Sequence, residues 1–162
     1  MVTTTQAISI GVPLTRVWAA WADFGNVRKW SPVVTNSYLT TKKLSEVGTW
    51  RHCDLFPRGE VEETIVRWQE NIQLVIDVHP VGPIARQQMT IDLVGHHAKE
   101  SETTVRVTIA LDPTPGADDN TDAMRDTFRA ILRETLAGLR HHLLTGETVT
   151  EITALAYDGL VD

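Results

Sequence analysis

Two residues of opposite charge, Arg51 and Glu63, are spaced so that they could meet across a β-hairpin. The stretches 47–55 and 60–68 flank a turn that contains proline and glycine, which predicts two antiparallel strands. Glu63 then lies opposite either Arg51 or Cys53, within reach of the guanidinium group. A guanidinium in an apolar cavity could bind a carboxylate or stabilise a developing enolate oxygen, with Glu63 orienting it or acting as a base. A structural ion pair is an equally good interpretation, because neither charge can be buried alone.

The six histidines are the other candidates for proton transfer or metal binding. His79 precedes Pro80 at the expected end of a strand and is the best of them for moving a proton, although a turn histidine without a function is the simpler interpretation. The doublets His96-His97 and His141-His142 do not favour a metal site. Adjacent residues point to opposite faces of a strand, and on a helix they diverge by about 100°, so neither doublet converges on one ion.

The sequence carries no pattern for a cofactor. The single cysteine, Cys53, excludes an internal disulfide, a thiolate zinc site and an iron–sulfur centre, so we interpret it as a small core residue. No phosphate-binding loop or dinucleotide motif is present, and we expect no cofactor. Gln87 stands in an otherwise apolar row with Met89 and Ile91, so its amide needs a partner, which could be a ligand, Arg51 or water.

The composition is that of one globular domain. Of the 162 residues, 42% are hydrophobic, and a chain of this length can build one sizeable core. The 21 acidic residues outnumber the 15 basic ones, giving a net charge of −6, so nucleic acid and anionic membranes are poor partners. No signal-peptide pattern and no apolar run of membrane-spanning length is found, so we expect a cytoplasmic protein.

The elements that must position these residues begin with a short strand and two short helices. Alternation over 3–10 predicts a strand with one buried face. Pro13 suits the first turn of a helix, which we expect to end near Gly25. A second short helical turn over 26–30 leads into a strand near 33–40.

The rest of the chain predicts a meander of strands followed by one long helix. After the hairpin, alternating residues indicate further antiparallel strands at 72–78, 85–93 and 103–111. Asp118, Asp119, Asn120 and Thr121 offer N-caps for an amphipathic helix that runs to Gly146. The tail has no firm period. Together these elements predict an α+β fold in which a curved antiparallel sheet wraps around the C-terminal helix.

Several short motifs occur in a fixed order: Pro13, Val17 and Trp18; Asp23-Phe24-Gly25; Trp30-Ser31-Pro32; Gly48 with Arg51; Glu63 ahead of the Ile65 to Trp68 strand end; and the terminal helix. In these motifs the sequence resembles the START and polyketide cyclase/dehydratase superfamily, also called SRPBCC, which has the helix-grip fold. The resemblance extends over roughly residues 3–146. We therefore expect a single ligand-binding domain over 1–146 and a tail of unassigned structure over 147–162.

The resemblance implies that Arg51 points into an internal cavity, and strand alternation then places Cys53 and Leu55 beside it. Alternation alone does not decide which face is inward. Trp30 would lie at the edge of the cavity, where it could stack on a flat ligand. The expected catalytic residues are Arg51, Glu63 and His79, and the expected ligand-binding residues are Trp30, Cys53, Leu55, Ile65, Ile76, Gln87, Met89, Met124, Phe128 and Leu132.

The resemblance also implies a polyketide cyclase/dehydratase-like function: a hydrophobic aromatic or polycyclic molecule binds in the cavity and undergoes cyclisation or dehydration without a cofactor. Cavity shape would fold the substrate and Arg51 would support the developing oxyanion, so Arg51→Ala is expected to abolish turnover and leave the fold intact. A carrier or sensor that binds a lipid-like or polyketide ligand without chemistry is the alternative, and a chaperone-associated interaction domain is a third. The protein could form a homodimer under each of these three functions.

Overall fold

The central element is a curved antiparallel sheet. The computed structural model describes residues 1–42, 46–96, 98–117 and 120–162, and within them eight strands form one sheet in the order β2-β3-β4-β5-β6-β7-β1-β8. Every neighbouring pair is antiparallel. The strands are β1 (Val2–Ile10), β2 (Val34–Leu39), β3 (Trp50–Leu55), β4 (Glu60–Gln69), β5 (Gln73–Val78), β6 (Ile84–His96), β7 (Lys99–Pro113) and β8 (Leu160–Val161). The helices are α1 (Leu14–Ala22), the 3-10 helix η1 (Phe24–Lys29) and α2 (Thr121–Thr145).

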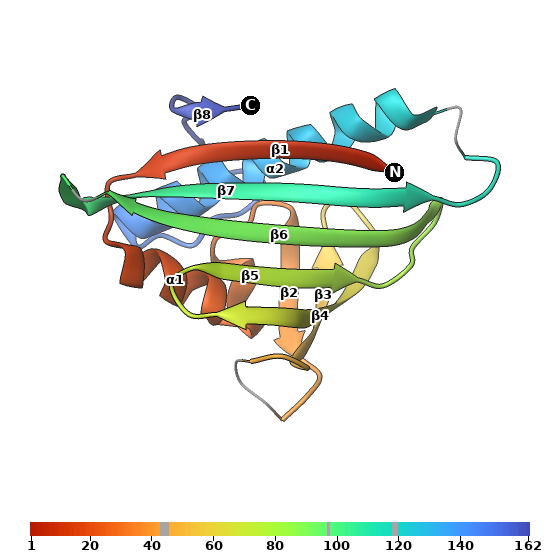
Figure 1. Ribbon diagram of the computed structural model, residues 1–162, viewed down its shortest axis with the longest axis horizontal. Coiled ribbons are helices and arrows are strands. Elements are labelled where there is room, and N and C mark those ends of the chain that lie inside the picture. Colours follow the sequence, from red (N-terminus) through yellow and green to blue (C-terminus); the bar gives the residue numbers. More distant parts are fainter. Residues whose placement is uncertain (43–45, 97, 118–119) are drawn as a thin grey trace.

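Helix α2 lies across one face of the sheet (Figure 1). It contacts β1 and β7 and buries leucines at helical spacing, from Leu132 to Leu143. It ends as predicted at Gly146, whose φ of 76° is the left-handed conformation that glycine adopts freely. Its N-cap residue is Asn120, whereas Asp118 and Asp119, two of the predicted caps, lie outside the described residues. The predicted α+β fold, a curved sheet around a C-terminal helix, is confirmed.

The two short helices follow β1 as predicted, but the boundary between them differs. Helix α1 ends at Ala22, before Gly25, which lies inside η1. A Cβ atom on Gly25 would lie 2.9 Å from the side chain of Leu39. Glycine is therefore required at this position by the close approach of β2, and it does not act as the stop signal of α1.

The tail, whose structure the sequence left open, packs against the domain. Val149 is buried, and its N–H donates a hydrogen bond of 2.9 Å to the carbonyl oxygen of Lys29. Arg140 of α2 donates to the carbonyl oxygen of Ala156 over 2.9 Å. Strand β8 then pairs with the middle of β1. Residues 147–162 thus extend the sheet and cover the C-terminal half of α2.

Gly138 lets α2 approach the chain that follows η1. A Cβ atom on Gly138 would lie 2.4 Å from the carbonyl oxygen of Trp30 and 2.8 Å from Cδ of Pro32. We expect Gly138→Ala to lower the free energy of unfolding by about 1–3 kcal/mol through overpacking, although alanine favours a helix by about 1 kcal/mol. Urea denaturation followed by circular dichroism measures the change.

Gly11→Ala is the matched control, because a Cβ atom there meets no other atom within 4 Å. Equal stability of the two alanine variants would contradict the close contact at Gly138.

Candidate functional site

The predicted ion pair occupies facing positions of β3 and β4. Arg51 and Glu63 are direct partners in the strand register. Of the two residues predicted to lie opposite Glu63, it is therefore Arg51 and not Cys53 that does so. Nε of Arg51 donates a hydrogen bond to Oε2 of Glu63. Both residues are buried, with 3% and 7% of their surface exposed. Burial strengthens the attraction between the charges and makes each dependent on the other.

Phe24 holds the guanidinium of Arg51 from another side. Nη1 of Arg51 donates a hydrogen bond of 3.0 Å to the carbonyl oxygen of Phe24, and Cζ lies 3.9 Å from the centroid of the Phe24 ring. The flat guanidinium is thus fixed by one ion pair, one hydrogen bond and one cation–π contact. Its other terminal nitrogen, Nη2, has no hydrogen bond to any described residue. Arg51 is therefore positioned rigidly and keeps free donors.

An internal pocket of about 360 Å³ lies between the sheet and α2, and both members of the ion pair line it. This volume is near the lower end of the range for small-molecule sites. The β3–β4 hairpin, the segment that follows η1, the inner faces of β6 and β7, and α2 form its walls. The walls are mainly apolar, and the other two charged residues in them, Arg58 and Glu60, are exposed. The arrangement can enclose an apolar molecule and offer it one fixed guanidinium.

Most of the predicted ligand-binding residues line this pocket: Trp30, Cys53, Leu55, Gln87, Met89, Phe128 and Leu132. The inward face of β3 is thus the one that the resemblance implied. Three predicted residues do not reach the pocket. Ile65 and Ile76 are 0% exposed and fully enclosed by other core side chains. Met124 packs at the edge of the core, one helical turn before Phe128 and beyond the pocket.

Other residues of the pocket wall were not predicted as ligand-binding from the sequence, among them Trp21, Val78, Ile84, Ile109, Ile131 and Thr135. The strand alternation at 72–78 and 103–111 could have identified Val78 and Ile109 as residues that face the pocket. Ile84 could not have been found in this way, because β6 has an irregular register between Ile84 and Arg86. As a result Ile84 faces the pocket, while the next residue, Ala85, lines a groove on the outer face.

Cys53 lies beside the ion pair as a neutral thiol. Its Sγ is 3.8 Å from Oε2 of Glu63. Burial raises the pKa of Cys53 to about 12; the positive charge of Arg51 opposes this rise and the negative charge of Glu63 adds to it. The thiolate is the reactive form, so Cys53 is not a nucleophile at neutral pH. This agrees with its interpretation as a core residue.

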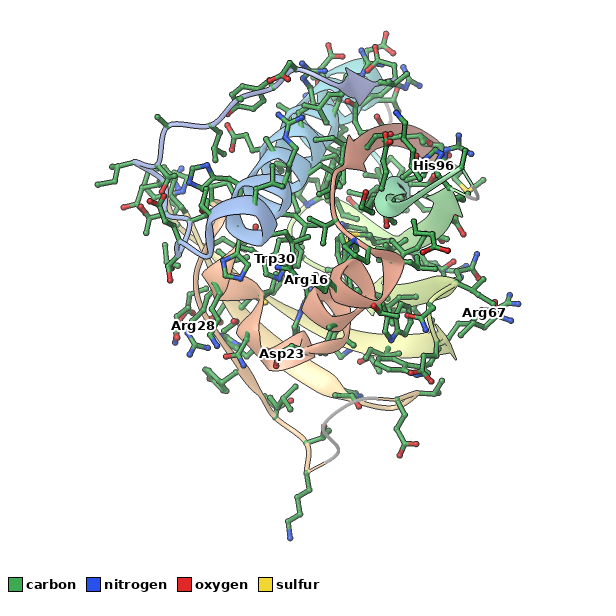
Figure 2. All side chains as sticks on the ribbon, turned by 90° about the vertical axis from the view of Figure 1, so that its left-hand side faces the viewer. Arg16, Asp23, Arg28, Trp30, Arg67 and His96 are labelled. Atoms are coloured by element: carbon green, nitrogen blue, oxygen red, sulfur yellow. The ribbon has the colours of Figure 1, made fainter. Side chains whose placement is uncertain are left out.

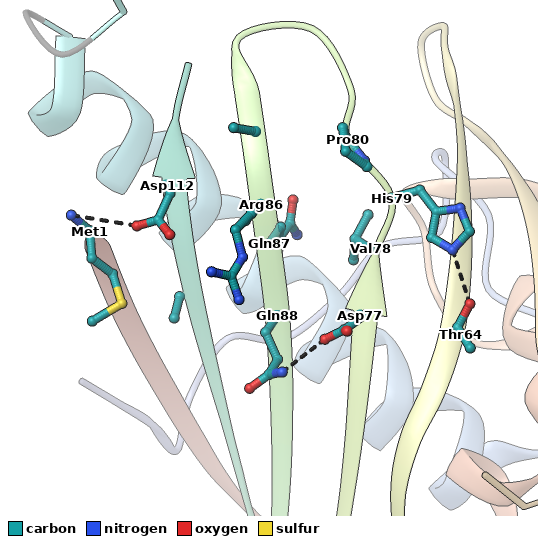
Figure 3. Close-up of a pocket in the computed structure, with 12 residues that line it drawn as sticks. Met1, Thr64, Asp77, Val78, His79, Pro80, Arg86, Gln87, Gln88 and Asp112 are labelled. Atoms are coloured by element: carbon teal, nitrogen blue, oxygen red, sulfur yellow. Dashed lines mark hydrogen bonds and ion pairs between the residues drawn. The ribbon is translucent and has the colours of Figure 1, made fainter. Parts of the chain in front are cut away.

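His79 lies on the face of the sheet opposite the pocket. Its Nε2 is 3.0 Å from Oγ1 of Thr64, and its ring packs edge-on against Trp50 with 4.4 Å between the centroids. It lines an outer groove of about 420 Å³, and in Figure 3 the strands lie between this groove and α2. Val78 faces the pocket, and the next residue of an extended strand faces away. The structure therefore does not bring His79 together with Arg51 and Glu63.

On the same outer face His52 lies among carboxylates. Its Nδ1 is 2.5 Å from Oε1 of Glu62, and its Nε2 is 2.9 Å from Oδ1 of Asp54 and 3.7 Å from Oε2 of Glu60. His52, Asp54 and Glu60 form the one group of three such residues in the described part of the chain whose ligand atoms all lie within 4.8 Å of one another, close enough to hold a metal ion. Both ring nitrogens of His52 already face carboxylates. A protonated imidazole can therefore balance the negative charge of these carboxylates, as a bound metal ion would. The expected absence of a metal stays a prediction.

The His52 cluster should make stability depend on pH. Hydrogen bonds, first to Glu62 and then to Asp54, raise the pKa of His52 above its ordinary value of 6.5. Folding therefore favours the protonated imidazole: the stabilisation is complete below pH 6.5 and is lost as the pH rises through the higher folded-state pKa. We expect the free energy of unfolding to fall more steeply above pH 6.5 in the wild type than in His52→Gln. Urea denaturation over a pH series measures both slopes, and parallel slopes would contradict this assignment.

The histidine doublets have ordinary polar partners. Nε2 of His141 is 2.8 Å from Oε2 of Glu147, and Nδ1 of His142 is 2.7 Å from the carbonyl oxygen of the same residue. Nε2 of His96 is 2.8 Å from Oγ1 of Thr104, and His97 lies outside the described residues. These contacts link the end of α2 to Glu147 and link His96 of β6 to Thr104 of β7.

Trp30 and Gln87 contribute polar groups that lack protein partners. Trp30 lies where α2 meets the N-terminal helices (Figure 2) and packs edge-on against Trp21, with 4.7 Å between the centroids. Its indole nitrogen is buried without an acceptor in the described part of the chain. The amide of Gln87 lines the pocket and likewise has no partner among the residues described. Of the partners expected for Gln87, Arg51 is thus not the one, which leaves a ligand or water.

Comparison with known proteins identifies a family that matches most of the chain. A family model described as polyketide cyclase / dehydrase and lipid transport matches residues 1–143. The chain belongs to this family. The resemblance seen in the sequence is therefore confirmed, and the family is one whose description is consistent with a hydrophobic ligand in the internal pocket. A search among curated proteins finds no match.

Solved structures support the family fold at low sequence identity. A protein from Thermobifida fusca superposes with a TM-score of 0.75 at 20% identity, covering 92% of this chain and 97% of that one. A START superfamily protein from Mycobacterium smegmatis gives a TM-score of 0.73 at 11% identity, with 89% and 98% covered. A protein of the dynemicin biosynthetic locus gives 0.66 at 19% identity, with 91% of this chain and 49% of that one covered. No helix in the described residues of this family member is long and apolar enough to span a membrane.

Proposed function

We propose that the protein binds a hydrophobic aromatic or polycyclic molecule in the pocket beside Arg51 and promotes its cyclisation or dehydration without a cofactor. The observation that carries the proposal is a buried guanidinium, 3% exposed, in the wall of a mainly apolar pocket of about 360 Å³. The family description, polyketide cyclase / dehydrase and lipid transport, supports the same class of ligand.

Catalysis would come from shape and from one fixed charge. The pocket walls hold a flexible substrate in a folded conformer whose reacting atoms are close together. In an aldol-type step the carbon next to a carbonyl group gives up its proton to water, the enolate carbon forms the new bond to a second carbonyl carbon, and the resulting alkoxide takes up a proton. The unpartnered Nη2 of Arg51 donates to the enolate oxygen while that oxygen carries negative charge. Glu63 and Phe24 keep the guanidinium in place, so that it needs little reorganisation in the transition state. Glu63 acts here as a positioning residue.

Native mass spectrometry of the protein as purified tests the binding function. We expect one small molecule per chain to be retained, and its release on unfolding to allow its identification. Purified protein without ligand should also show quenching of tryptophan fluorescence by an aromatic compound, because Trp21 and Trp30 both line the pocket. No retained molecule together with no quenching would contradict the proposal.

A carrier without chemistry is the second candidate, and two observations favour it. His79, the expected proton-transfer residue, lies on the outer face, and Cys53 has its pKa raised to about 12. The pocket thus holds no histidine and no reactive thiol among the described residues. A bound polyketide-like compound that is returned unchanged after prolonged incubation would support the carrier, whereas a cyclised or dehydrated product would support the enzyme.

A further inference from the structure

The charges that line the pocket cancel. Its charged residues are two arginines, Arg51 and Arg58, and two glutamates, Glu60 and Glu63, so the formal charge of the walls is zero. Arg58 and Glu60 are exposed, where water and salt screen them. The charges that a bound molecule meets inside are therefore those of the buried pair, which neutralise each other.

A carboxylate in the pocket would disturb this balance. It could pair with Arg51 only in competition with Glu63, which would leave one of the two anions buried without a counter-charge. A second anion beside Glu63 is also repelled, because burial removes the water that would screen the two charges. Cys53 cannot balance the added negative charge. Its thiol is neutral, and its S–H already points to Oε2 of Glu63, 3.8 Å from Sγ.

An uncharged molecule with an acceptor oxygen fits the same walls. Nη2 of Arg51 and the amide of Gln87 have no hydrogen-bond partner in the part of the chain that the structure describes. A carbonyl or hydroxyl oxygen can accept from these donors without separating Arg51 from Glu63. A pure hydrocarbon would exclude water from the same donors and leave them unpaired, which costs free energy.

We infer that the pocket selects uncharged molecules that carry a carbonyl or hydroxyl oxygen on an apolar aromatic body, and that it rejects carboxylates of the same shape. Glu63 is the residue that sets this selectivity, because it neutralises the guanidinium that would otherwise attract an anion. The inference rests on the proposed binding function and adds the charge of the ligand to it.

Three compounds of closely similar shape test the inference: 2-acetylnaphthalene, 2-naphthoate and 2-ethylnaphthalene. Isothermal titration calorimetry at neutral pH is expected to show that the wild type binds the ketone about tenfold or more tightly than the carboxylate. The hydrocarbon should also bind less tightly than the ketone. In Glu63→Gln the preference for the ketone should shrink or reverse, because Arg51 is then free to pair with naphthoate.

The wild type alone decides the question if Glu63→Gln does not fold. Any naphthoate that enters should bind as the neutral acid, so its affinity should rise as the pH falls and binding should take up a proton. Calorimetry in two buffers of different ionisation enthalpy detects that proton. Naphthoate that binds as tightly as the ketone, with no proton uptake, would overturn the inference and leave the binding function standing. Binding of none of the three compounds would overturn the binding function, and the inference with it.

Discussion

Replacing Arg51 by methionine is expected to lower the free energy of unfolding by about 3–5 kcal/mol, because Glu63 would remain buried without its counter-charge. Glu63 is 7% exposed and has Arg51 as its ion-pair partner. The double variant Arg51→Met/Glu63→Gln should recover most of the loss, since it removes both charges and nearly preserves the side-chain volumes. Guanidinium denaturation of the wild type and the two variants measures these differences. A single variant as stable as the double variant would show that the two charges are not coupled.

This coupling changes how the role of Arg51 has to be tested. The expectation from sequence that Arg51→Ala abolishes turnover with the fold intact does not take account of the anion that the substitution leaves behind. Loss of activity in that variant would not separate catalysis from stability. The double variant, which leaves the net charge of the pocket walls unchanged, is the proper background: if it folds and binds but does not turn over, the pair of Arg51 and Glu63 contributes to catalysis.

Filling the pocket from α2 is expected to abolish ligand binding. Thr135 lines the pocket of about 360 Å³, so the indole of Thr135→Trp would enter it and take up space that a bound molecule needs. We expect an affinity for 2-acetylnaphthalene that is lower by about a hundredfold or more, a difference of about 2.7 kcal/mol. Stability should change little, because the new side chain enters a space that already exists and forces less overpacking than in a filled core.

The matched control is Thr127→Trp on the same helix. Thr127 is exposed and does not line the pocket, so the same substitution there should leave the affinity unchanged. Calorimetric titration compares the two variants. Unchanged binding in Thr135→Trp would place the ligand elsewhere.

The sequence predicted the parts of the site that follow from strand alternation. The spacing across the hairpin brought Arg51 and Glu63 together, and the resemblance supplied the inward face that alternation alone could not. The same alternation places the side chain of His79 on the opposite face of the sheet from that of Val78. Residue type favoured His79 as a proton carrier, but the direction of its side chain decides what it can reach.

Other features depend on contacts that no local pattern encodes. The irregular register at the start of β6 brings Ile84 inward, and the close approach of β2 requires glycine at Gly25. The interaction of Arg51 with Phe24 joins residues on η1 and β3 that alternation does not relate. The tail has no period because only two of its residues, Leu160 and Val161, form a strand. In each case tertiary packing, and not the local sequence, determines the structure.

The Nε–H resonance of Arg51 in a nitrogen-15 NMR spectrum tests the central claim most directly. This proton is held in a buried ion pair, so it should exchange slowly and remain visible. Titration with 2-acetylnaphthalene should shift it together with the side-chain amide of Gln87 and the methyl groups of Leu132, which line the same pocket. Shifts confined to Thr64, Asp77 and His79, around the outer groove, would contradict the account.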